Sequence, residues 1–361
     1  MPERPPADPT SQQSTGRGAW AEPGVVTIAP GVHRMPLPLP MDGLRAVNVY
    51  VLETADGLTL VDGGWAIPAS RELFDAGLRS LGHTARDVRR FLVTHMHRDH
   101  YTQARVIASE FGGRVSLGVG DRPNLERVLT ESDGAVEDAH LLRLRGAGAE
   151  HLHAGWVEQV PSRPPDRGQY ALPDDWLVGD LVLDLGDRRL HALATPGHTQ
   201  GHYVFADPEA SLLFAGDHVL STITPSIGFE PAHVQQPLRD FLSSLAKVRA
   251  LPDLTLLPAH GPVTGSSHQR VDELLAFHEA RLDASLAAVH GGARTAWEVA
   301  QVLRWTRRER HLDELGVFDQ ALATFETQAH LELLALRGRV AREAGETVVF
   351  GPLREAAVLP G

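Results

Sequence analysis

The stretch THMHRDH, residues 94–100, places three histidines and one aspartate directly after the apolar run Phe91-Leu92-Val93. We interpret the apolar run as a buried strand whose end presents the cluster. His95 and His97 are two residues apart, so in an extended segment their side chains lie on one side. Histidine is poor at forming a core, so a fixed cluster of this kind indicates a binding site.

Four other segments also place a histidine or an aspartate where an apolar strand is expected to end. They are VDGG around Asp62, TPGHT around His198, AGDH around Asp217 and PAHGP around His260. Strand ends at one edge of a sheet are where α/β folds build sites, so we expect these segments to meet. The chain has no cysteine, so any transition metal must be held by imidazole and carboxylate groups.

This set of side chains suits two divalent cations. The predicted ligands are His95, His97 and His198 for one cation and Asp99, His100 and His260 for the other. Three imidazoles form the open site of a catalytic zinc. The second site mixes carboxylate and imidazole ligands, so its ligand set is chemically harder. Asp217 is expected to bridge the pair, because one carboxylate has two oxygens. Zinc is the first expectation, and manganese or iron is compatible with the same ligands.

Such a centre predicts hydrolysis of an electrophilic carbonyl or phosphorus. Metals about 3.5–4 Å apart share a hydroxide whose pKa has fallen towards ~7. We expect Asp217 and Asp99 to be catalytic, the first as the bridge and the second by orienting the hydroxide or accepting its proton. Thioesters, lactones, β-lactams and phosphodiesters all satisfy this geometry.

The motifs resemble those of the metallo-β-lactamase superfamily. THMHRDH is similar to its HxHxDH signature, and the other four segments follow in the family's order over residues 47–263. The resemblance implies an α+β fold, a four-layer αββα sandwich with a dinuclear metal centre at one edge. It also implies that Asp62 is not a ligand and holds the metal-binding loop by hydrogen bonds. His202 either supports the site in a similar way or is a histidine on the sheet surface.

A narrower resemblance is to the β-lactamase-like-protein-2 group, which includes endoribonucleases and is similar to fungal polyketide thioesterases. It is carried by THMHRDH, TPGHTQGH, HGPV after His260 and a terminal winged-helix-like module. Two departures concern the substrate. Tyr101 and Gln103 stand where many relatives have a small or apolar residue and a glycine, and His100 is unusually far from His198.

Composition and hydrophobic periodicity divide the chain into three parts. Residues 1–19 are rich in Pro, Ser and Gln and are expected to be a disordered tail. Residues 20–290 form the predicted catalytic domain, with a lid-like insertion at residues 121–176. Residues 291–361 show two helices and a hairpin, the outline of a small winged-helix-like domain. Within the catalytic domain, Ser70 is the expected N-cap of the first helix.

Charge favours an acyl hydrolase over a nuclease. The net charge is −12 and the pI about 5.9, which disfavours a protein that grips nucleic-acid phosphates. The alternatives are a phosphodiesterase or endoribonuclease, a lactonase or β-lactamase-type hydrolase, and a regulator with a vestigial site. We expect a small-molecule acyl substrate, no membrane partner and a cytoplasmic location, and a homodimer is left open. Substrate contacts are predicted for Tyr101, Trp65 and Ile223.

Overall fold

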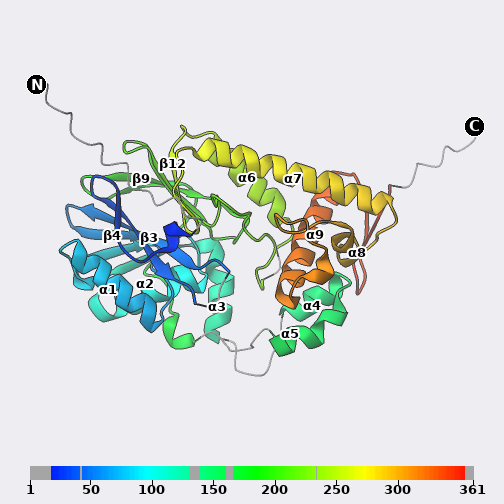
Figure 1. The fold of residues 1–361 in the computed structure, drawn as a ribbon, viewed down its shortest axis with the longest axis horizontal. Helices are drawn as coiled ribbons and strands as arrows, with labels where there is room; N and C mark the ends of the chain where they lie inside the picture. The colour runs from blue at the N-terminus through cyan, green and yellow to red at the C-terminus, as the bar shows by residue number, and fades with distance from the viewer. Residues whose placement is uncertain (1–17, 41–42, 131–138, 160–165, 233, 354–361) are drawn as a thin grey trace, which may run out of the picture.

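The computed structural model describes residues 18–40, 43–130, 139–159, 166–232 and 234–353. Nearly all of the predicted tail, residues 1–19, lies outside them. Two sheets face each other, and helices cover their outer faces (Figure 1). The first sheet contains β1 (Val26–Ala29), β2 (Val32–Pro38), β3 (Ala46–Thr54), β4 (Gly57–Val61), β5 (Val88–Leu92), β6 (Arg114–Gly118) and β7 (Asp175–Leu177), in this order. The second contains β8 (Leu181–Asp184), β9 (Arg189–Ala194), β10 (Tyr203–Asp207), β11 (Leu212–Gly216) and β12 (Thr255–Pro258), in the order β12-β11-β10-β9-β8.

Strand alternation separates the core into layers. In β10 and β11, Phe205 and Phe214 face a cluster shared with the first sheet. The neighbouring Val204 and Leu213 face the opposite side, where they pack with helices. Successive strand side chains point to opposite faces, so a fully apolar strand such as β11 is buried on both sides. The mixed α/β sandwich is thus helix, sheet, sheet, helix.

The outer layers are helical. On the first sheet, α1 (Pro68–Ser80), α2 (Arg98–Phe111) and α3 (Arg122–Thr130) share one hydrophobic cluster with the strands. On the second sheet lie α6 (Pro237–Arg249) and α7 (Ser267–His290). The prediction of Ser70 as an N-cap was wrong, because α1 already begins at Pro68 and Ser70 is buried inside it. Proline is well suited to a first helical turn, since its missing N–H has no partner there anyway.

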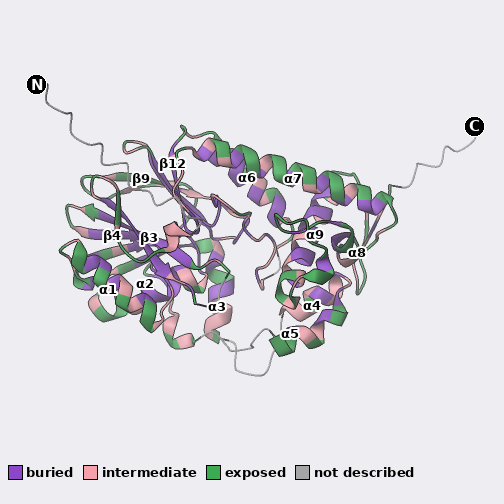
Figure 2. Cartoon of the chain, in the orientation of Figure 1, coloured by how far each residue is buried: buried purple, intermediate pink, exposed green. Residues whose placement is uncertain are grey.

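The region after residue 290 continues the core of the second sheet. It contains α8 (Ala296–Val302), α9 (Val317–Leu336) and the antiparallel pair β13 (Ala341–Glu343) and β14 (Val349–Gly351), which confirms the predicted order of two helices and a hairpin. One hydrophobic cluster includes Leu213 of β11, Leu274 of α7 and Leu331 of α9. Figure 2 shows α7 buried along one side and exposed along the other. The residues after 290 are therefore packed onto the sandwich through this shared cluster.

The insertion predicted as a lid contacts this region as well. Its helices α4 (Ala139–Gly146) and α5 (His153–Gln159) form a small cluster with Phe325 of α9, to which Leu144 and Trp156 contribute. Its last residues form β7 and extend the first sheet. Within the described ranges, no helix combines the length and the apolarity needed to cross a bilayer.

Candidate metal centre

All seven predicted ligands come together at one edge of the sandwich. The first group consists of His95, His97 and His198, whose ring nitrogens converge. His95 Nε2 lies 2.8 Å from His97 Nδ1, and His198 Nε2 lies 3.1 Å from the same atom. His95 follows β5, and His97 is the N-cap position of α2, so the end of one strand and the start of the next helix place them.

The second group consists of Asp99, His100 and His260. Asp99 Oδ2 lies 3.4 Å from His260 Nε2 and 3.6 Å from His100 Nε2. Asp99 and His100 lie in the first turn of α2, and His260 follows β12 of the other sheet. The group therefore forms only where the two sheets meet.

Asp217 lies between the two groups. Its Oδ2 is 3.5 Å from His198 Nε2, and its Oδ1 is 3.4 Å from His260 Nε2 and 3.6 Å from His100 Nε2. It follows the end of β11, where Gly216 has φ 51°. A Cβ at Gly216 would lie 2.7 Å from His202 Nε2 and 2.8 Å from Thr94 Cβ, so the close approach of this loop requires glycine.

Hydrogen bonds to the far ring nitrogens orient three histidines. His198 Nδ1 donates to the Ser226 carbonyl at 2.8 Å, and His260 Nδ1 donates to the Ala46 carbonyl at 2.7 Å. A carbonyl only accepts, so these nitrogens carry the protons and the Nε2 lone pairs face the centre. His100 Nδ1 makes the corresponding bond to Asp62 Oδ2 at 2.9 Å.

Asp62 fixes the loop that carries the first ligands. It accepts from the Thr94 backbone N–H at 2.8 Å and from the Thr94 hydroxyl at 3.0 Å, besides His100. Its own φ is 63°, a left-handed conformation that is uncommon for a residue with a side chain. Strain of this kind persists where surrounding contacts demand it, as these hydrogen bonds do.

His202 contacts the backbone of Asp217. Its Nε2 accepts from the Asp217 N–H at 3.1 Å, and its Nδ1 lies 2.9 Å from the Thr195 hydroxyl. It is fully buried beside His95, with the two rings stacked at 5.2 Å. The alternative of a histidine on the sheet surface was wrong, because His202 is buried and hydrogen-bonded to the backbone of Asp217.

Burial and neighbouring charges shift the pKa values of the histidines in opposite directions. Burial and the neighbouring His198 lower the pKa of His97 to about 3, and burial with His100 and His97 holds the pKa of His95 well below its usual value. Burial opposes protonation of His100 too, but Asp62, Asp99 and Asp217 outweigh it and raise its pKa to about 10. The first group is thus a set of neutral imidazoles, which is the form that binds metals.

Three polar atoms of the centre lack hydrogen-bond partners among the described residues. His100 Nε2, His260 Nε2 and Asp217 Oδ1 are buried without a hydrogen bond to any described residue. An unpaired buried polar atom costs roughly 1–3 kcal/mol, so several facing one point indicate a missing partner. Divalent cations bound by imidazole and carboxylate fit these atoms, and the residues present therefore suit a metal.

Comparison with known proteins agrees with this chemistry. The family model described as "Metallo-beta-lactamase superfamily" matches residues 42–260. The chain belongs to the metallo-beta-lactamase superfamily. Members of this superfamily are generally hydrolytic metalloenzymes, and the match ends at His260, the last predicted ligand.

Relatives of this superfamily chain are distant. It is 25% identical over 232 residues to a beta-lactamase-like protein 2 homolog of Caenorhabditis elegans, covering 64% of this chain and 61% of that one. It is 26% identical to an atrochrysone carboxyl ACP thioesterase of Aspergillus fumigatus, covering 64% and 55%. The chain spans less than two thirds of the length of either relative. A lactamase-like protein nscB of the same fungus is 24% identical over 84% of this chain and 78% of that one.

Solved structures share the fold over more of the chain. A metallo-beta-lactamase family protein from Thermus thermophilus has a TM-score of 0.68 at 29% identity, covering 91% of this chain and 100% of that one. A beta-lactamase domain protein from Burkholderia ambifaria has a TM-score of 0.72 at 23% identity, covering 96% and 98%. The common fold therefore extends beyond residues 42–260.

Two positioning residues of this superfamily member were missed in the sequence. The buried carboxylate of Asp121 accepts from the Met96 N–H and the Gly201 N–H, each at 2.8 Å, and so joins the loop of His95 and His97 to the loop of His198. Asn48 donates to the carbonyls of Pro258 and Gly261, both at 2.9 Å, and so holds the His260 loop. Asp121 lies at the start of the unassigned insertion and Asn48 inside a strand, so neither stands out by spacing.

The three residues predicted to contact the substrate differ in exposure. Tyr101 is fully buried and donates to the Ala171 carbonyl at 2.6 Å, so the expectation that it walls the cleft was wrong. Trp65 is half-buried under Arg98, whose guanidinium carbon lies 4.2 Å from the ring centroid. Ile223 is 41% exposed and lies in the sequence between Asp217 and Ser226, the partner of His198. Trp65 and Ile223 therefore keep exposed surface that a substrate can contact, and Tyr101 does not.

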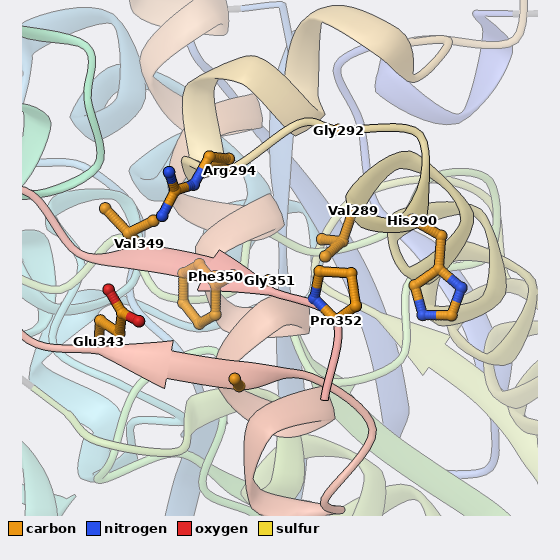
Figure 3. Close-up of a pocket in the computed structure, with 10 residues that line it drawn as sticks. Val289, His290, Gly292, Arg294, Glu343, Val349, Phe350, Gly351 and Pro352 are labelled. Atoms are coloured by element: carbon orange, nitrogen blue, oxygen red, sulfur yellow. The ribbon is translucent and has the colours of Figure 1, made fainter. Parts of the chain in front are cut away.

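A separate hollow lies at the far end of the molecule. Its volume is about 290 Å³, and it is lined by the end of α7 and by the hairpin, including His290, Arg294 and Phe350 (Figure 3). None of its lining residues belongs to the histidine cluster. It is therefore distinct from the candidate metal centre.

Proposed function

We propose that this chain is a metal-dependent hydrolase of thioesters or other acyl esters, with two divalent cations, zinc first, in the candidate metal centre. The supporting observation is the position of Asp217, with one carboxylate oxygen near His198 and the other near His260. A carboxylate directed at two ligand groups can serve a cation in each. No ligand position of the predicted set is replaced by a residue unable to bind metal, which argues against a vestigial site.

The chain's own residues define the chemistry around the cations. Divalent cations held there supply Lewis acidity, which polarises a carbonyl group and acidifies water. Asp99 is 15% exposed at its side chain and lies 3.4 Å from His260, so it can orient an attacking water and accept its proton. His202 and Asp62 keep Asp217 and His100 in place by the bonds described above. Asp217 and Asp99 are accordingly the proposed catalytic carboxylates.

Two side chains on the segments that carry ligands support an acyl substrate. Trp65 offers an aromatic face against Arg98, the residue after His97, and Ile223 offers an exposed apolar side chain in the segment that follows Asp217. The Arg98 guanidinium over Trp65 is exposed and suits an anionic group at the far end of an acyl carrier. One relative is named an ACP thioesterase, which supports hydrolysis of a thioester-linked acyl group.

Other predictions accompany this proposal. The net charge of −12 opposes binding to a phosphate backbone, which keeps a nuclease as the second candidate. The winged-helix identity of the C-terminal elements, a homodimer and a cytoplasmic location remain predictions. So does the division of the chain at residue 291.

A substrate panel tests the proposal. Purified full-length protein is offered an acyl thioester, a lactone, a chromogenic β-lactam, a phosphodiester and a short RNA, with and without chelator. We expect the thioester or ester to be cleaved with the highest kcat/KM and the chelator to abolish cleavage. Activity that survives complete metal removal would refute the metal-dependent mechanism, and preferred cleavage of RNA would establish the alternative.

A further inference from the structure

A second group of buried histidines lies away from the metal centre, between α7 and α9. His278 of α7 and His330 of α9 are 0% and 1% exposed, and their rings stack at 5.3 Å. Glu326 lies one helical turn before His330, so both side chains project from one side of α9. None of these residues belongs to the ligand groups of the centre or to its supporting hydrogen bonds, and the proposed hydrolysis gives them no task.

The two imidazoles face each other through nitrogens that can both carry lone pairs. His330 Nδ1 donates to the Glu326 carbonyl at 2.7 Å, which leaves His330 Nε2 without a proton when the ring is neutral. This Nε2 lies 3.2 Å from His278 Nδ1. Two nitrogens each about 2.0–2.1 Å from one tetrahedral cation would be about 3.3 Å apart. The observed separation is close to that value.

Both rings are held neutral. Burial and the neighbouring His330 keep the pKa of His278 well below its usual value, and burial lowers the pKa of His330 to about 4. A neutral imidazole is the form that binds a metal. Backbone carbonyls that orient a ligand ring through its other nitrogen are typical of metal-bound histidines, and the Glu326 carbonyl does this here.

The carboxylate of Glu326 completes the group. Its Oε1 is buried with no hydrogen-bond partner among the described residues, and burial raises the pKa of this carboxyl. Arg281, the charged group that acts on it, donates to the Arg304 carbonyl at 2.8 Å and stacks 4.1 Å over Trp305. One ligand atom from each of Glu326, His278 and His330 lies within 4.8 Å of the others. Glu326 as a whole is half-buried, but a buried carboxylate oxygen without a partner is costly, and a bound cation would relieve that cost.

We propose that His278, Glu326 and His330 form a third cation site, separate from the hydrolytic centre and selective for zinc or a similar borderline divalent ion. Two imidazoles and one carboxylate are a donor set that zinc accepts, with the fourth position left to water. The site connects the helix that covers the second sheet to the long helix of the C-terminal region. Its effect is structural, because a cation bound there holds α9 against α7.

Metal counting on the full-length protein tests this site. Wild type, Glu326→Gln and His330→Gln are dialysed against zinc and analysed for bound metal per chain. We expect each variant to bind one equivalent less than wild type, with unchanged hydrolytic activity per chain. Glu279→Gln is the matched control: it removes an exposed carboxylate beside His278 on α7 and should keep the wild-type count. Equal counts in wild type and both variants would overturn the site.

Cobalt gives an independent readout in a protein whose hydrolytic centre has been weakened. With His95→Ala and Asp217→Ala combined, the visible absorption of tetrahedral cobalt should persist at one equivalent. It should disappear when His330→Gln or Glu326→Gln is added. An absence of this absorption in the folded double variant would refute the third site, whether or not the proposed hydrolysis is correct.

Discussion

We expect Glu230 to make the stability of this protein depend on pH near neutrality. The side chain is 6% exposed, and its Oε1 accepts from the Asn124 amide at 2.7 Å. Burial and the nearby Asp121 raise its pKa to about 8, although the backbone of Gln200, the Asn124 bond and Arg143 act in the opposite direction. Arg143 also donates to the Glu230 carbonyl. Glu230 lies in the same loop as Ser226, the partner of His198.

The sign of the effect follows from proton binding. The folded state holds this proton more tightly than the unfolded chain, whose glutamate has an ordinary pKa of 4.5. The contribution of Glu230 is therefore fully present below about pH 4.5 and is lost as the pH rises towards about 8. Each pH unit in this window corresponds to about 1.4 kcal/mol, so a rise from about pH 5 to about pH 7 costs roughly 3 kcal/mol.

Glu230→Gln removes this titration while keeping an oxygen for Asn124. We expect the free energy of unfolding of the variant, measured by urea titration, to exceed that of wild type by an amount that grows with pH up to about 8. Glu126→Gln, an exposed carboxylate paired with Arg122, is the control and should give a difference that is small and flat. A pH-independent difference for Glu230→Gln would refute the reasoning.

Three further changes test the centre and the packing around it. Asp217→Ala should lower kcat/KM at least about 100-fold, because the variant loses several kcal/mol of transition-state stabilisation that the cations supply. The circular dichroism spectrum should not change. Retained turnover would contradict the bridging role. Asp121→Asn should weaken zinc binding about 10–100-fold in a competition assay, because the amide oxygen can replace only one of the two carboxylate oxygens that accept from the Met96 and Gly201 N–H groups. At saturating zinc, kcat should recover. Gly118→Ala would press a Cβ into the Gly201 carbonyl oxygen and should cost about 1–3 kcal/mol in urea titrations, whereas Gly43→Ala, with nothing within 4 Å, should be neutral.

The cluster of candidate ligands could be predicted from the sequence because the ends of strands are recognisable there. Each of His95, His198, Asp217 and His260 follows an apolar segment, and such segments end at one edge of the sandwich. The superfamily and the mixed α/β sandwich followed from the same segments. Local signals at the ends of strands therefore carried most of the fold and of the centre.

Tyr101 shows why neighbours in sequence mislead on a helix. It follows His100 directly, but successive helical side chains point about 100° apart, so the two cannot share a face. His100 turns into the centre, and Tyr101 turns into the core of the first sheet, where its hydroxyl reaches Ala171. The expectation treated proximity along the chain as proximity at the cleft.

The insertion and the C-terminal elements depend on packing that periodicity does not record. The three-residue strand β7 is held by its pairing with β6 and by the Arg114–Asp175 ion pair, not by any alternating pattern. An apolar face on α9 shows that it is covered, but not that Leu144 and Trp156 of the insertion cover it. Partners at long sequence separation are invisible to a local pattern.

The bonds of Asn48 and His260 have a consequence for biosynthesis. Asn48 on β3 reaches Pro258 and Gly261, and His260 reaches back to Ala46, across more than 200 residues of chain. Residue 261 must therefore be synthesised before β3 of the first sheet can form its hydrogen bonds with the His260 loop. Contacts so distant in sequence form slowly, because a long loop must close before they contribute. We therefore expect the His260 loop to join the loop of His95 and His97 late in folding, after most of the chain has been made.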